Sequence, residues 1–138
     1  MLKGRQRDAV VDDRLGVRND LGISKALASL ESFKTDGSLV GIKGKPDNLG
    51  LLEGPWKEVW LVQEDDILYT VTSVQTPLAW LADDVWMFPQ IFRGRITAKN
   101  MATVRRALRR IGATISIDLP YYAQDNYPTT RRPPNEGQ

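Results

Sequence analysis

The sequence contains neither cysteine nor histidine. These absences exclude disulfide bonds, zinc sites built from thiolate or imidazole ligands, and catalysis by either side chain. They also remove the usual general base near neutral pH. Long apolar runs are lacking as well, and no signal-peptide pattern opens the chain. We therefore expect a non-enzymatic protein without catalytic residues, metal or cofactor, located in the cytoplasm and free of membrane contact.

Acidic and basic residues are segregated along a chain of 138 residues whose formal net charge is only +2. Residues 53–66 carry five acids against one lysine, whereas residues 93–110 are purely basic. Patches of opposite sign on one small domain can meet each other or meet a neighbouring subunit, and we expect a homo-oligomer. The length suits one domain, placed at residues 1–118, followed by a Pro- and Tyr-rich tail at residues 119–138.

Residues 97–111 (TAKNMATVRRALRRI) carry the clearest helical pattern. Thr97 is the predicted N-cap, because its hydroxyl can accept a backbone N–H, and Gly112 is the predicted C-terminal stop. Apolar residues recur with a period of about 3.6 residues, as on one face of a helix. The residues expected to be buried along this stripe are Met101, Val104, Leu108 and Ile111.

The remaining faces of this helix are basic, and no acid occurs between residues 93 and 117. Arg105 and Arg109 line one flank, four residues apart. Lys99, Arg106 and Arg110 follow the face opposite the apolar stripe. One interpretation is a solvated face whose arginine stems cover apolar neighbours. The other is a site for phosphate or another polyanion, which arginine binds through paired hydrogen bonds.

Two other helices are predicted upstream. An apolar repeat in residues 23–33 indicates a packing helix, and Pro55 suits the first turn of a second helix that ends at Gln63. Trp56 and Trp60 lie one turn apart on this second helix. Tryptophans at such spacing more often anchor a core or an interface than form a ligand platform.

Most of the remaining ordered segments read as short β-strands. Asp83 and Asp84 form a tight turn between two of them, and Pro77 precedes a strand in which it need not donate to the ladder. The fold class is therefore α+β: a small antiparallel sheet of about four to six strands packed against helices, with an extended C-terminal tail. The predicted strands are residues 39–43, 67–74, 78–81, 85–88, 91–96 and 113–117.

Part of the chain resembles a family of small, mostly uncharacterised domains found in phages and in actinobacterial and archaeal genomes. That family carries the pattern T-P-[IL]-A-W, then a Trp, then T-T-S-K-H-Q, then R-R-A-L. Two family side chains are replaced here, since Ala98 stands for the Ser and Asn100 for the His. The corresponding pieces, about a third of the chain, are residues 73–80 (SVQTPLAW), Trp86, residues 96–100 (ITAKN) and residues 105–108 (RRAL).

More distantly, this layout is similar to that of phage sponge proteins that counter Thoeris defence by sequestering cyclic nucleotide signals. The resemblance implies a phage protein in the host cytosol that binds, without catalysis, a nucleotide-like molecule. Cations would bind its phosphates, and an aromatic side chain would stack on its base. Trp80 and Phe92 are further candidates for this aromatic side chain. The candidate ligand-binding residues are Arg105, Arg109, Arg106, Lys99, Asn100, Trp86 and Phe88.

Two other classes stay open. The protein is alternatively a virion component or an inhibitor that binds a partner, with the paired tryptophans and the tail as interface features. A nucleic-acid-binding accessory protein is the third class, because the basic helix could follow a phosphate backbone. The low net charge and the acidic stretch make that class less favoured than a small ligand.

Overall fold

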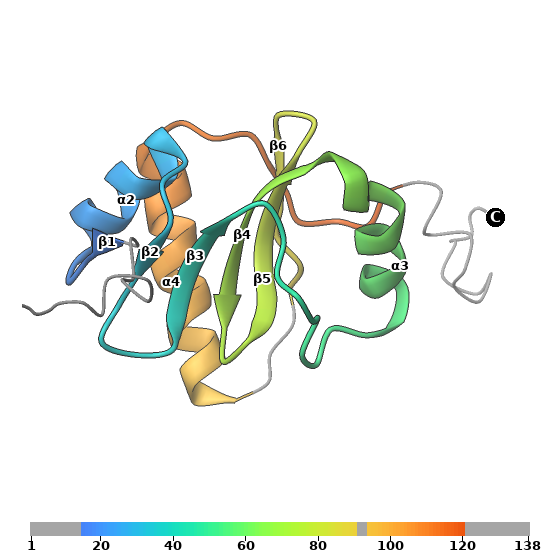
Figure 1. Ribbon diagram of the computed structural model, residues 1–138, viewed down its shortest axis with the longest axis horizontal. Coiled ribbons are helices and arrows are strands. Elements are labelled where there is room, and N and C mark those ends of the chain that lie inside the picture. The colour runs from blue at the N-terminus through green and yellow to red at the C-terminus, as the bar shows by residue number, and fades with distance from the viewer. Residues whose placement is uncertain (1–14, 91–93, 121–138) are drawn as a thin grey trace, which may run out of the picture.

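The computed structural model describes residues 15–90 and 94–120 (Figure 1). Within these ranges the chain forms three layers. Helices α2 (Asp20–Ser29) and α4 (Arg95–Arg110) cover one face of a central sheet, and α3 (Gly54–Gln63) covers the other. The α+β class is confirmed, with seven strands in the described residues in place of the four to six expected.

The strands lie in the sheet in the order in which they occur in the sequence. The pairs from β2 to β6 are antiparallel, as predicted, but the two outermost pairs are parallel, so the sheet is mixed. A predicted strand at residues 39–43 is confirmed as β3. The strands are β1 (Leu15–Gly16), β2 (Phe33–Lys34), β3 (Leu39–Lys43), β4 (Ile67–Ser73), β5 (Thr76–Ala82), β6 (Val85–Met87) and β7 (Ile115–Ser116).

The two parallel pairs explain why α2 and α4 share a face. Each pair is joined by a crossover, α2 between β1 and β2 and α4 between β6 and β7. Alternation of direction through the meander makes these four strands point the same way, and both crossovers advance in the same direction across the sheet. Because such connections are nearly always right-handed, both helices must lie on the same side.

Each face of the sheet carries its own apolar cluster. On the side of α2 and α4, residues of β5 such as Ala79 and Leu81 join the buried stripe of α4. On the side of α3, the alternate residues Trp80 and Ala82 pack with the helix. The division follows from the strand geometry, in which successive side chains point to opposite faces.

Helix α3 begins one residue before Pro55, and this proline sits in its first turn as predicted. Trp56 and Trp60 are buried, which confirms that they are core anchors. A one-turn 3-10 helix, η2 (Glu64–Asp66), then leads into β4. The acidic stretch is therefore split between α3 and the surface turn that follows it.

Two hairpin turns use residues with positive φ. Asp83 and Asp84 have φ values of 53° and 64°, which confirms the tight turn expected between β5 and β6. Val74 and Gln75 occupy the same region, at 50° and 67°, so residue 74 lies in the β4–β5 turn and not in the strand predicted for it. Such values are uncommon for a β-branched side chain like that of Val74.

The strand predicted at residues 78–81 is longer than expected. Strand β5 begins at Thr76, and Pro77 pairs with Thr72 inside the ladder. The register shifts beside it, between Val71 and Thr72, which marks a β-bulge. A bulge interrupts the regular hydrogen bonding and so allows a proline that cannot donate.

The segment before α4 departs most from expectation. Residues 91–96 were predicted to form a strand, but Arg95 and Ile96 are the first residues of α4, and residues 91–93 lie outside the described part. The predicted strand at residues 113–117 reduces to the two residues of β7. No helix of residues 15–90 and 94–120 combines the length and apolar character required to cross a membrane.

Candidate functional site

Helix α4 has the predicted apolar stripe but a different start. Met101, Val104 and Leu108 are buried, and Ile111 packs against the same cluster. The helix begins at Arg95 with Gly94 as N-cap, so the prediction that Thr97 caps it is wrong. Gly94 has a φ of 116°, which changes the direction of the chain before the helix. A residue with a side chain would adopt this value only at a steric cost.

The basic residues of α4 do not form one continuous surface. Arg106 binds the carboxylate of Asp20 on α2, with 2.7 Å between its Nε and the Asp20 Oδ2. This hydrogen bond is the main cause that lowers the pKa of Asp20, and the charges of Arg106 and Arg110 add to it. One of the predicted cations is therefore paired within the fold by an acid distant in sequence.

Arg105 and Arg109 lie on the other flank. The Nη2 of Arg105 donates to the Gln90 Oε1 at 2.9 Å, and its guanidinium carbon lies 5.8 Å from the centre of the Phe88 ring. The side chain of Arg109 has no hydrogen bond or ion pair within residues 15–90 and 94–120. On this flank Arg109 is exposed and Arg105 is half-buried.

The aromatic residues proposed to hold a base are buried. Phe88 and Trp80 have no exposed surface, and Trp86 is 4% exposed. Trp86 packs edge-on against Tyr69, with ring centroids 5.8 Å apart. A ligand could not stack on these rings without opening the core, so their burial assigns all three to packing. Phe92 lies outside the described residues.

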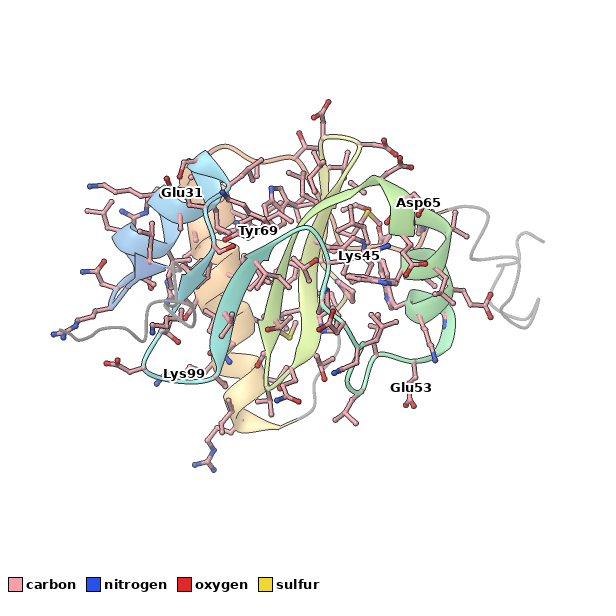
Figure 2. The ribbon with its side chains drawn as sticks, viewed as in Figure 1. Glu31, Lys45, Glu53, Asp65, Tyr69 and Lys99 are labelled. Carbon is pink, nitrogen blue, oxygen red and sulfur yellow. The ribbon has the colours of Figure 1, made fainter. Side chains whose placement is uncertain are left out.

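Three of the candidate residues meet in a polar cleft between the start of α2, the β2–β3 turn and the middle of α4. We call it the α2–α4 cleft, and its volume is about 370 Å³. Figure 2 shows Lys99 beside the β2–β3 turn, at one side of this cleft. The lining residues with polar or charged side chains include Arg18, Asp20, Asp36, Lys99, Asn100 and Arg106.

Asn100 holds α4 against two strands. Its Nδ2 donates to the Oγ of Ser38, at 3.0 Å, and to the Oγ of Ser73, at 2.7 Å. Both amide hydrogens are thereby used, and its Oδ1 has no partner within the described residues. Asn100 therefore has a structural role, and it also lines the α2–α4 cleft.

Sequence reasoning missed the part of the cleft that comes from the N-terminal region. Arg18 precedes Asn19, whose side chain caps α2 by accepting from the Gly22 N–H at 2.9 Å. Arg18 and Lys99 form no ion pair with any residue of the described ranges. No local sequence pattern predicts a role for Arg18. It lies at the cleft with residues of α4 only because the β1–α2–β2 crossover brings these distant segments together.

Comparisons with known proteins found no family model, no curated protein and no solved structure that matches this chain. The family resemblance therefore stays a prediction.

Proposed function

We propose that the protein binds a small phosphate-bearing anion, of nucleotide type, without catalysis, and that it does so in the α2–α4 cleft. The observation that carries this proposal is the presence of Arg18 and Lys99 on the walls of one polar cavity, both without an acidic partner in the described ranges. The proposal keeps the ligand class expected from the basic helix. It moves the site from Arg105 and Arg109 to the opposite flank.

The composition of the cleft favours one or two phosphates over a long polyanion. Arginine can bind a phosphate through two parallel hydrogen bonds, and lysine adds a compact charge. Asp20 and Asp36 lie in the same lining and would repel phosphates that extend beyond the two cations. The hydroxyl of Thr103 and the free Oδ1 of Asn100 could bind hydroxyl groups of a sugar.

Charge reversal of Lys99 should weaken anion binding by about tenfold or more, because one hydrogen bond to a charged group is worth about 1.5–3 kcal/mol. Pyrophosphate and AMP are suitable probes, measured by isothermal titration calorimetry. Arg109→Glu makes the same charge change on the same helix, at an exposed side chain that has no hydrogen bond or ion pair among the described residues, and serves as the matched control.

The alternative location gives the opposite pattern. If Arg109→Glu abolishes binding and Lys99→Glu leaves it intact, the ligand lies on the flank of Arg105. If the wild-type protein binds neither probe, the proposal of phosphate recognition is wrong.

The Asp20→Asn substitution should increase affinity for pyrophosphate several-fold. The neutral side chain no longer competes for the Arg106 guanidinium or repels the ligand. The same substitution should lower the stability of the fold near neutral pH. Because the pKa of Asp20 is lowered in the fold, its ion pair stabilises the protein above the ordinary carboxyl pKa and is lost as the pH falls through the lowered value.

The unfolding free energy of Asp20→Asn should therefore fall less than that of the wild type as the pH is lowered through the acid range. Urea denaturation at a series of pH values measures this difference. Asp84→Asn is a control in a surface turn, with no ion pair among the described residues. Equal pyrophosphate affinity for the wild type and Asp20→Asn would show that Arg106 does not contribute to the site.

A further inference from the structure

The tip of the β4–β5 hairpin lies close to the start of α4 (Figure 1). Residues of both segments line a second cavity. We call it the hairpin-tip cavity. Its volume of about 380 Å³ lies within the range of about 300–1,000 Å³ that is common for small-molecule sites. Its lining residues in the described ranges include no acid. The apolar ones are Leu51, Val74, Pro77, Leu78, Pro89 and Ile96.

Large exposed hydrophobic side chains gather around this cavity. Leu51 is 62% exposed, Val74 57% and Ile96 60%, although they come from three different segments of the chain. Single exposed apolar residues are ordinary on protein surfaces. Three that line one cavity make much of its surface apolar, which is typical of a site that binds an apolar group.

Several hydrogen-bond donors line the cavity. Arg95 lines it together with the first turn of α4, whose N-cap, Gly94, offers no side chain to the free backbone N–H groups. Ser73 is 3% exposed and also lines the cavity. Its Oγ accepts from Asn100, while its own hydroxyl hydrogen has no acceptor in the described residues. Each of these groups would be satisfied by an anionic acceptor.

The tip of the β4–β5 hairpin contains a residue with a strained backbone. Val74 adopts a φ of 50°, a conformation that costs a β-branched residue stability and that glycine or asparagine adopts readily. Strain of this kind is found most often where a binding site requires the side chain. Here the strained residue contributes part of the apolar wall of the cavity.

We infer that the hairpin-tip cavity binds a small amphiphilic carboxylate, with a short apolar chain and one anionic head. The chain packs against Leu51, Val74 and Ile96. The head accepts hydrogen bonds at the start of α4, from Arg95, the first-turn N–H groups and Ser73. This site is separate from the α2–α4 cleft and takes a different class of ligand.

Octanoate is the direct probe, with octylammonium as a partner of similar chain length and opposite charge. Both are titrated into the full chain below the concentration at which they form micelles, with backbone amide NMR shifts as readout. Octanoate should shift the amides of Gly94 to Thr97, and octylammonium should bind at least about tenfold more weakly. Equal affinity for the two, or shifts centred on the exposed residues Leu61 and Val62 of α3, would overturn the inference.

Two variants separate binding from folding. Val74→Asn relieves the backbone strain and removes an apolar side chain from the cavity wall. It should therefore raise the melting temperature and weaken the binding of octanoate several-fold. Ile96→Glu places an acid in the first turn, which favours the helix but repels the head, so affinity should fall at least about tenfold. Leu61→Glu, an equally drastic change on α3, should leave affinity unchanged. Unaltered octanoate binding in both cavity variants would refute the site.

Discussion

Replacing Trp80 with alanine should lower the free energy of unfolding by about 3–5 kcal/mol, the usual cost of truncating a fully buried aromatic side chain. Trp80 has no exposed surface. It packs edge-on against Trp60, with centroids 5.0 Å apart, and against Trp56, at 6.1 Å. Its Nε1 donates to the Gln63 Oε1 at 2.8 Å. All three partners belong to α3, so the substitution removes the main attachment of that helix.

Urea denaturation followed by far-ultraviolet circular dichroism measures this loss without relying on tryptophan emission. Val62→Ala is the control, because Val62 is 66% exposed on the same helix and its truncation should change stability by less than about 0.5 kcal/mol. Trp80→Phe keeps most of the packing and removes the N–H, so its effect should be intermediate. A loss of less than 1 kcal/mol for Trp80→Ala, on the order of an average substitution, would show that α3 is held by other contacts.

Gly41→Ala should destabilise the protein by about 1–3 kcal/mol or more, through overpacking and not through loss of a contact. Gly41 lies in β3 opposite Phe33 of β2. A methyl group there would overlap the ring of Phe33 and the hydroxyl oxygen of Tyr69. Both neighbours are fully buried. Phe33 is held by the packing around it, and Tyr69 is also held by its hydroxyl, which donates to the Glu31 carbonyl at 2.6 Å.

Tyr69 stays protonated over the usual pH range, because burial raises the pKa of its hydroxyl. The methyl group would therefore displace a neutral donor from its acceptor and leave the buried Tyr69 hydroxyl without a partner. Gly16→Ala is the matched control, since Gly16 also lies in a strand and a methyl group there meets no atom within 4 Å. Its stability should stay constant or rise slightly. Equal stability of the two variants in thermal denaturation would contradict the overpacking.

The sequence predicts the elements whose patterns are local. The α4 stripe, the paired tryptophans of α3 and the Asp83–Asp84 turn each depend on residues within a few positions, and each is found in the structure. The start of α4 was misplaced because Thr97 fits the preference for an N-cap side chain, whereas Gly94 ends the preceding segment by its backbone freedom.

The parts that could not be predicted depend on distant segments. Strands β1 and β7 have two residues each and are defined by pairing with a neighbour, not by a pattern of their own. The ion pair between Arg106 and Asp20 joins residues 86 positions apart. Sequence reasoning could identify the cations of α4, but it could not tell that one of them is neutralised or that Arg18 lines the same cleft as Lys99.

The brevity of β1 and β7 limits how copies of this protein can associate. Within residues 15–90 and 94–120 both outer strands of the sheet are two residues long, so each offers few unpaired N–H and C=O groups to an approaching chain. Long free edges are what allow sheets of separate molecules to join into continuous ribbons. Self-association of the described part is therefore expected to use side-chain surfaces, such as the outer face of α3 with its exposed Leu61 and Val62, more than the pairing of backbone edges.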